Sequence, residues 1–326
     1  MELQWNHKIF SCSASNFDSL ALEAFRVQYQ EVTVYRHYVD ALGVLPDTVN
    51  SLSKIPFLPI QFFKSAQVTR GAFQPESIFE SSATTGMTVS RHLVKELALY
   101  EESFTKGFEK VHGDAGQYCI IGLLPSYLER STSSLVYMVK SLIEKSGHSE
   151  SGFYLNEWDK LHQTLLKLET AGQPTLLIGV SFALLELADK FPMQLKHTRI
   201  IETGGMKGRG REMVKQEMHD ILKAAFQVEK IEAEYGMTEL LSQAWSSGEG
   251  IYSCPPWMKV VIRDDEDPLQ ILQQGAGAIN VVDLANINSC CFIATEDAGK
   301  VYENGQFEIL GRMDGSDLRG CSLLVV

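Results

Sequence analysis

Positive charge is scarce in this sequence of 326 residues. It has 29 Lys and Arg residues against 41 Asp and Glu residues, which gives a formal net charge of −12 at pH 7. A chain with this balance is not expected to bind nucleic acid or an anionic membrane in general, because a basic surface supplies most of that affinity. Any phosphate-binding site must therefore be a local basic pocket.

Long apolar runs are lacking as well. The longest uncharged run, residues 170–185, has 16 positions and contains Gly, Gln and Pro. This is shorter than the roughly 20 apolar residues that a membrane-spanning helix needs. The first residues carry an acid where a signal peptide has basic charge, and no apolar stretch follows. We therefore expect no membrane span and a cytoplasmic location.

Cysteine pairs and metal-ligand motifs are also missing. The six cysteines form no C-x-x-C pair, which argues against a disulfide framework or a zinc site, so we expect free thiols. The sequence contains no H-E-x-x-H motif and no G-x-S-x-G elbow, so ordinary hydrolases fit poorly. Its composition, 44% hydrophobic and 21% charged, is typical of a globular protein.

Short apolar runs alternate with amphipathic helical segments from about residue 117 onward. This alternation is typical of βαβ units, which form a mostly parallel sheet covered on both faces. The sequence therefore predicts an α/β fold with a doubly wound core. The expected strands are 118–124, 175–180, 198–202 and 228–234, and the expected helices are 133–145, 182–191 and 212–226.

Three regions are expected along the chain. Residues 1–75 predict a helical cap, residues 76–250 the doubly wound core, and residues 251–326 a β-rich subdomain. The last region includes a hairpin at 300–310. Its Asn304-Gly305 pair favours a type I′ turn, in which both central residues have positive φ.

Ser81-Ser-Ala-Thr-Thr-Gly86 is the first candidate site segment. Small hydroxyl residues ending in Gly, just before an expected helix, offer O–H and N–H donors to an anion. The same residue types also suit a turn that caps the helix, and the segment alone does not decide between the two. The candidates for a phosphate loop are Ser81, Ser82, Thr84, Thr85 and Gly86.

Glu234-Tyr-Gly-Met-Thr-Glu239 follows an expected strand and is the second candidate. Glu239 could hold a divalent metal on a nucleotide, Thr238 could donate to a phosphate, and Tyr235 could stack on a base. Ligands bind at the carboxyl ends of strands in doubly wound folds. A plain turn is the alternative, because Gly and polar residues are common in any loop.

The third candidate segment, 202–211, contains Gly204 and Gly205 and leads into a basic helix start. An anion site at this start is plausible, and a solvated basic surface is the alternative. A Walker A loop is excluded, because Arg211 stands where that loop has Lys. Between 207 and 215 one acid, Glu212, is outnumbered by four bases: Lys207, Arg209, Arg211 and Lys215.

These three segments, in this order, resemble the motifs of the acyl-adenylate-forming superfamily. The likeness continues in Thr295-Glu-Asp297, which looks like the Thr-Gly-Asp of that superfamily, and in Gly311-Arg312-Met-Asp314, which looks like its hinge motif. Within the superfamily, the chain is most similar to the acyl-protein synthetase (LuxE-like) family of the bacterial luminescence type. It resembles the phenylacetate-CoA ligases more distantly. The likeness spans about residue 57 to the C terminus.

The resemblance implies ATP and Mg²⁺ as cofactors. The Ser81–Gly86 loop and a magnesium ion on Glu239 would neutralise the triphosphate, and Thr238 would orient the α-phosphate. Asp297 would bind the ribose hydroxyls, with help from Arg312. The core at 76–250 would thus be nucleotide-binding, and its further nucleotide-binding residues would be Gly204, Gly205, Tyr235 and Gly236.

The resemblance also implies two chemical steps. A carboxylic acid, of the fatty-acid class, would become an acyl-adenylate, and a thiol would then accept the acyl group. Cys321 stands where this family has its acyl-accepting cysteine, and Arg319 is a candidate to lower its pKa. The alternative for Cys321 is a small buried residue in a terminal strand. The acyl acceptor could be a partner reductase, a carrier protein or a glycan-assembly enzyme.

Two departures from the superfamily keep other functions open. Ala83 stands where the phosphate loop has Gly, and the chain ends just after the hinge motif. We therefore expect the small C-terminal lid domain, with its catalytic Lys, to be absent. The alternatives are a CoA ligase, an acyltransferase that uses preformed thioesters without ATP, and a non-catalytic nucleotide-binding relative. The sequence does not determine the acyl chain, the acceptor or the oligomeric state.

Overall fold

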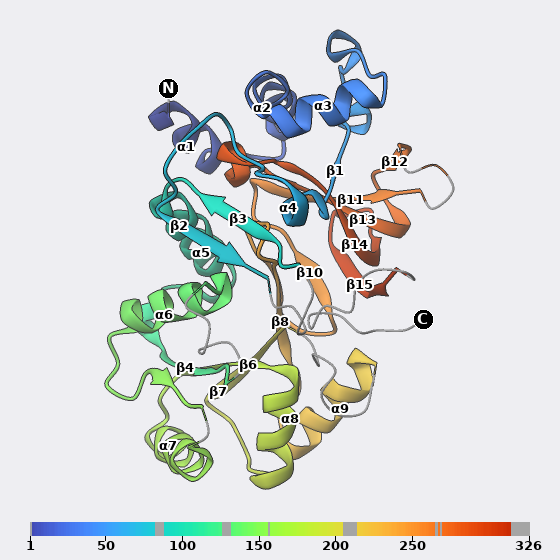
Figure 1. Ribbon diagram of the computed structural model, residues 1–326. Helices are drawn as coiled ribbons and strands as arrows, with labels where there is room; N and C mark the ends of the chain where they lie inside the picture. The colour runs from blue at the N-terminus through green and yellow to red at the C-terminus, as the bar shows by residue number, and fades with distance from the viewer. Residues whose placement is uncertain are drawn as a thin grey trace. The chain divides into compact units, whose positions relative to one another are not determined.

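The structure is a computed structural model that describes residues 2–81, 88–125, 132–155, 157–204, 214–264, 267 and 269–313 (Figure 1). These residues divide into two compact units. Among the described residues, the first unit holds those up to 104, 236–243 and 253–313, and the second holds those within 105–235 and 244–252. The division at residues 75 and 250 stays a prediction. No helix within the described ranges has the length and apolar character of a membrane span.

The second unit contains a mostly parallel sheet. Its strands lie in the order β5-β4-β6-β7-β8, all paired in parallel, and β9 then pairs antiparallel with β8. The predicted α/β, doubly wound sheet is confirmed, since the chain moves from β4 to β5 on one side and to β6 on the other. The strands are β4 (Cys119–Leu123), β5 (Gly152–Phe153), β6 (Thr175–Val180), β7 (Thr198–Thr203), β8 (Glu232–Tyr235), β9 (Ala244–Ser246) and β10 (Ile251–Ser253).

Four helices accompany these strands within the described part of the second unit. The predicted helix at 133–145 begins as expected, because Ser133 Oγ accepts a hydrogen bond from the Val136 amide at 3.3 Å. It ends at Gly147, whose φ of 63° is left-handed. The helices are α6 (Ser134–Ser146), α7 (Trp158–Ala171), α8 (Ser181–Lys190) and α9 (Lys215–Phe226).

Close packing shapes the central strands of this sheet. Every residue of β4 and β6 is buried, as expected for strands covered on both faces. A Cβ atom added at Gly122 would lie 2.6 Å from the Phe153 ring, and one at Gly179 would lie 2.7 Å from Leu184. The two glycines therefore let large apolar side chains approach the sheet closely.

The first unit contains an antiparallel sheet in the order β12-β11-β13-β14-β15, with β1 parallel to β14. This confirms the β-rich character expected after residue 251. A separate hairpin pairs β2 with β3. The strands are β1 (Leu58–Pro59), β2 (Ser77–Glu80), β3 (Arg91–Val94), β11 (Met258–Arg263), β12 (Ile271–Leu272), β13 (Gly275–Asp283), β14 (Phe292–Val301) and β15 (Phe307–Arg312).

The N-terminal helices pack on this antiparallel sheet through aromatic side chains. Tyr35 stacks on Phe292 with ring centroids 6.0 Å apart, and Phe25 meets Tyr35 edge-on at 6.1 Å. Aromatic pairs of this kind contribute about 0.5–1.5 kcal/mol beyond area burial. The helices are α1 (Glu2–Phe10), α2 (Phe17–Glu31), α3 (Thr33–Ala41) and α4 (Phe62–Ser65), while α5 (Leu97–His112) contributes residues to both units.

The hairpin between β14 and β15 differs from the predicted turn type. Gly305 has a φ of 80°, but Asn304 is not among the residues with positive φ. The Gly305 amide donates to the Tyr302 carbonyl at 2.9 Å, and the Tyr302 amide donates to the Gln306 carbonyl at 2.8 Å. The turn is therefore a type I turn followed by a left-handed glycine, and the type I′ prediction is wrong.

Candidate functional site

Two predicted site residues meet across the β14–β15 pair. Asp297 and Arg312 are direct Cα partners in the antiparallel register. Arg312 Nε lies 3.6 Å from Asp297 Oδ1, and the two side chains are 12% and 6% exposed. The register shifts beside this pair, which leaves Leu310 without a partner on β14 and twists the strand locally. The structure thus brings together residues from two separate motifs.

The Tyr235–Glu239 segment leaves the sheet at the end of β8. Tyr235 is 9% exposed, and its ring packs edge-on against Tyr252 with centroids 6.0 Å apart. Gly236 and Thr238 are partly exposed, and Glu239 is buried. This is the carboxyl end of a parallel strand, the position at which doubly wound folds bind ligands.

Buried side chains hold the backbone that follows Gly236. His92 Nδ1 lies 2.9 Å from the Thr238 carbonyl, and Asn286 Nδ2 donates to the Glu239 carbonyl at 2.7 Å. Burial lowers the pKa of His92 to about 4, so its imidazole is neutral near pH 7. A carbonyl only accepts, and therefore Nδ1 carries the proton and donates.

The Ser81 segment has a different context from the one predicted. Ser81 follows β2, and β3 intervenes before α5 begins at Leu97. The Leu97 amide donates to Glu76 at 2.7 Å, so the side chain of Glu76 caps this helix. Ser81 Oγ accepts from the Ser90 amide at 2.9 Å, and the phosphate-loop and helix-cap interpretations of Ser81–Gly86 both stay predictions.

Gly204 directly follows β7, and its φ of 70° is a left-handed conformation that favours glycine. The residues beside it form a buried polar network in the second unit. Lys215 Nζ lies 2.9 Å from Glu202 Oε2 and also donates to the Tyr252 hydroxyl. Ser181 Oγ donates to Glu202 Oε1 at 2.7 Å.

Lys215, one of the four bases counted between 207 and 215, is partly exposed, and its charge is paired with the Glu202 carboxylate. Burial on its own lowers the pKa of Lys215, but the Glu202 carboxylate and the Tyr252 hydroxyl together raise it above the usual lysine value. The cationic charge is thus retained inside the second unit, where it neutralises a buried acid.

Glu234 is a functional candidate that the sequence reading did not assign a role. Burial raises its pKa to about 7, although the Thr203 hydroxyl, which donates to it, opposes the shift. His92, Asp283 and Asn286 were not predicted either. The sequence offers one weak signal for Asp283, a charged residue at the end of the apolar run of β13. His92 and Asn286 stand in none of the motifs named above.

The described cysteines are poor nucleophiles. Burial raises the pKa of each one, and for Cys254 and Cys290 it reaches about 12. Reactive cysteines instead need a lowered pKa and solvent access. The five described cysteines are Cys12, Cys119, Cys254, Cys290 and Cys291, all free thiols as predicted.

Several predicted site residues lie outside the described residues. They are Ser82, Thr84, Thr85, Gly86, Gly205, Lys207, Arg209, Arg211, Asp314, Arg319 and Cys321.

The described residues suit a magnesium-bound nucleotide. No group of three or more His, Cys, Asp or Glu side chains that could hold a metal occurs in the described ranges. Mg²⁺ does not require one, because it is commonly held by one or two carboxylates together with substrate phosphates. Glu239 supplies a carboxylate of the right kind, and the Asp297 carboxylate is an acceptor suited to a pair of neighbouring hydroxyls.

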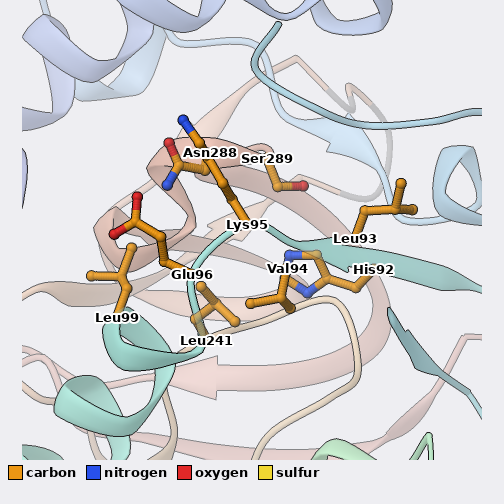
Figure 2. Close-up of a pocket in the computed structure, with 9 residues that line it drawn as sticks. All are labelled: His92, Leu93, Val94, Lys95, Glu96, Leu99, Leu241, Asn288 and Ser289. Carbon is orange, nitrogen blue, oxygen red and sulfur yellow. The ribbon is translucent and has the colours of Figure 1, made fainter. Parts of the chain in front are cut away.

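A small cavity lies beside His92 and Leu241 in the first unit (Figure 2). Its volume of about 10 Å³ leaves room for roughly one water molecule. It is therefore too small for an organic ligand. The other residues that line it are Leu93, Val94, Lys95, Glu96, Leu99, Asn288 and Ser289.

Known enzymes share this fold. The chain is similar to ATP-bound MatB from Rhodopseudomonas palustris, with a TM-score of 0.55, 20% identity, and coverage of 74% of this chain and 49% of that one. A malonyl-CoA ligase solved with methylmalonyl-CoA and AMP has a TM-score of 0.51, 16% identity, and coverage of 80% and 56%. The chain spans about half the length of these structures, and the likeness shows that the described chain shares their fold.

Curated relatives match nearly the whole chain. A long-chain-fatty-acid–luciferin-component ligase from Aliivibrio fischeri is 25% identical, over 94% of this chain and 86% of that protein. Its counterpart from Vibrio harveyi is 24% identical, over 92% and 84%. The family model described as "Acyl-protein synthetase, LuxE" matches residues 11–326. The chain is thus an enzyme of the ligase class and belongs to the LuxE acyl-protein synthetase family.

Proposed function

We propose that this enzyme uses ATP to activate a long-chain fatty acid as an acyl-adenylate and transfers the acyl group to a protein thiol. The family match and the names of the curated relatives support the acid and ligase classes. The observation that carries the nucleotide part is the Asp297–Arg312 pair, because two motifs that predict ribose contacts converge on one point of the sheet.

In the first step, a carboxylate oxygen of the acid forms a bond to the α-phosphorus of ATP. The bond from that phosphorus to the bridging oxygen breaks, and pyrophosphate leaves. Thr238 donates its hydroxyl to the α-phosphate, the Ser81–Gly86 loop donates to the outer phosphates, and Asp297 accepts from the ribose hydroxyls. Bound at Glu239, Mg²⁺ would neutralise phosphate charge. The carboxylate and the triphosphate are both anions and repel each other. Positioning and electrostatic stabilisation are therefore the main source of rate enhancement.

In the second step, a thiolate attacks the acyl carbon, the bond from that carbon to the AMP oxygen breaks, and AMP leaves. Cys321 is the proposed nucleophile. The high pKa values of the described cysteines support this choice, because they leave each of those thiols protonated near pH 7. The acyl group would then pass to a partner protein or carrier.

Exchange of labelled pyrophosphate into ATP tests the first step directly. We expect the wild-type protein to catalyse exchange that depends on Mg²⁺ and on a fatty acid, within a panel of short, long and aromatic acids. Glu239→Gln should lower the rate by about 100-fold or more, because it removes the charge that binds the metal without changing side-chain size. Glu186→Gln, at an exposed carboxylate paired with Lys190, is the matched control. No exchange by folded wild-type protein with any acid would contradict the proposal.

Covalent labelling tests the second step. With ATP and a labelled fatty acid, the wild-type protein should form a hydroxylamine-sensitive adduct, and Cys321→Ser should abolish it while leaving pyrophosphate exchange intact. Cys12→Ser, at a buried thiol, should keep the adduct. An adduct of unchanged yield in Cys321→Ser would refute this role, and labelling from an acyl thioester without ATP would point to a transferase instead.

A further inference from the structure

We propose that His92, Asn286 and Asp283 are positioning residues for adenylation. They would hold the backbone of residues 238–242, and through it the side chains of Thr238 and Glu239, in the reactive geometry. This inference rests on the proposed function, since it concerns the positions of Thr238 and Glu239 in the proposed site. All of these residues belong to the first unit.

The held segment is unusual for a loop. Residues 239–243 are all buried, yet they lie outside any helix or strand. Buried backbone N–H and C=O groups need hydrogen-bond partners, and a loop normally finds them in water. Here side chains from distant parts of the sequence supply the partners, so the shape of the segment depends on those side chains.

His92 supplies the first contact, to the Thr238 carbonyl at 2.9 Å. It sits on β3, is 1% exposed, and packs edge-on against Phe63 with centroids 5.7 Å apart. Figure 2 shows its ring beside Leu241, which belongs to the held segment. A rigid, buried imidazole in one tautomer fixes the direction of the Thr238 peptide.

Asn286 supplies the second contact, to the Glu239 carbonyl at 2.7 Å. It lies in a short 3₁₀ segment, Leu284–Asn288, and is fully buried. Gln28 of α2 steadies this segment, because its Nε2 lies 3.0 Å from the Asn286 carbonyl and its Oε1 accepts from the Cys291 amide at 2.9 Å. Through Gln28, helix α2 thus contributes to the position of Glu239.

Asp283 supplies several further contacts. Its Oδ2 accepts from the amides of Leu241 at 2.8 Å and Ser242 at 2.9 Å, and its Oδ1 accepts from the Ser242 hydroxyl at 2.6 Å and the Ala285 amide at 3.1 Å. One carboxylate therefore joins the held segment to the 3₁₀ segment that carries Asn286.

Together these contacts fix two successive carbonyls and two nearby amides around Glu239. With the backbone fixed, the side chains of Thr238 and Glu239 retain only their own rotations. A displacement of about 1 Å at a reacting group can cost about 100-fold in rate. Loss of one contact should therefore lower the adenylation rate by a larger factor than it lowers the fraction of folded protein.

The test compares substitutions that keep or remove one donor in the full chain. His92→Asn keeps an amide nitrogen where Nδ1 stands, while His92→Gln moves the donor towards Nε2 and His92→Leu removes it. Asn286→Leu removes the second donor at similar volume. Ser289→Ala is the matched control, because Ser289 lines the same cavity but donates to Val68 instead. The readouts are kcat, KM and Mg²⁺ dependence of pyrophosphate exchange, together with hydrogen exchange of the 236–243 amides.

We expect His92→Leu, His92→Gln and Asn286→Leu to lower kcat by about 10- to 100-fold. The three variants should also need a higher Mg²⁺ concentration for half-maximal exchange, because Glu239 then binds the metal less tightly. Their 236–243 amides should exchange faster. His92→Asn should recover most of kcat, and Ser289→Ala should change it by less than about twofold. If His92→Leu does not fold, the Asn and Gln pair decides the matter.

Equal losses in His92→Asn and His92→Gln would overturn the inference, as would wild-type kcat and amide protection in folded Asn286→Leu. An inactive wild-type protein would instead overturn the proposed function, and the positioning role with it. The two failures are distinguishable, because the first leaves wild-type exchange intact.

Discussion

The two units hold their candidate site segments by different means. In the first unit, residues 238–242 are held by the neutral donors of His92 and Asn286 and by the Asp283 acceptor. In the second unit, the segment that ends β7 is flanked by a charged network around Glu202 and Lys215. The hydrogen bonds in the first unit fix the orientation of backbone peptides, whereas the ion pair in the second unit neutralises the buried Glu202 carboxylate. Both units contain buried groups with shifted pKa values, His92 in the first and Glu234 in the second, so stability should respond to pH through both.

The largest effect is expected in the first unit. Asp283→Ala should lower the free energy of unfolding by about 5 kcal/mol, because it leaves several buried donors without a partner at about 1–3 kcal/mol each. Urea unfolding measures this loss. Asp18→Ala removes an exposed carboxylate paired with Lys259 and should cost less than about 1 kcal/mol. Similar small losses in both variants would show that the first segment is not held as described.

The next effect concerns the charged network. Lys215→Met should cost about 4 kcal/mol, because Glu202 is then left buried without its cation. Adding Glu202→Gln should restore part of the loss. Lys140→Met, at an exposed pair with Glu144, should change stability by no more than about 0.5 kcal/mol. If the double variant were no more stable than Lys215→Met, the two charges would not be coupled.

The smallest effect concerns pH. Because burial raises the pKa of Glu234 to about 7, the folded protein keeps a proton that the unfolded chain releases near pH 4.5. The stability from this group is present below pH 4.5 and is lost as pH rises towards 7, by at most about 3 kcal/mol. Glu234→Gln stays neutral, so the difference between variant and wild type should grow in favour of the variant from pH 5 to pH 8. Urea unfolding at both pH values checks this, and a constant difference would contradict it.

Sequence patterns predicted the regular elements well. The strand at 175–180 has the predicted bounds, because a run of apolar residues flanked by polar ones is typical of a buried parallel strand. The strand predicted at 228–234 forms only at 232–235, since residues 228–231 connect it to α9. The exact ends of a short strand depend on which residues pair with the neighbouring strands, and the local sequence does not determine that pairing.

Site residues were predictable only where they belong to a motif. Asp297 and Arg312 were named from separate segments, and their contact depends on the register between β14 and β15. Lys215 was counted among the bases of an anion site or a solvated helix start, because its partner Glu202 lies on a different element. His92 and Asn286 were not singled out, since the role proposed for them depends on the carbonyls they meet.

The sequence by itself predicted the α/β class, because short apolar runs alternate with amphipathic segments, and the order of its motifs resembled the family that the family model then matched. Only the tertiary structure decided which side chains hold Glu239, which charges are buried, and which strand precedes α5. The physical reason is distance along the chain. Hydrogen bonds and ion pairs between residues 13 to 258 positions apart form only when the fold brings their atoms within about 3 Å.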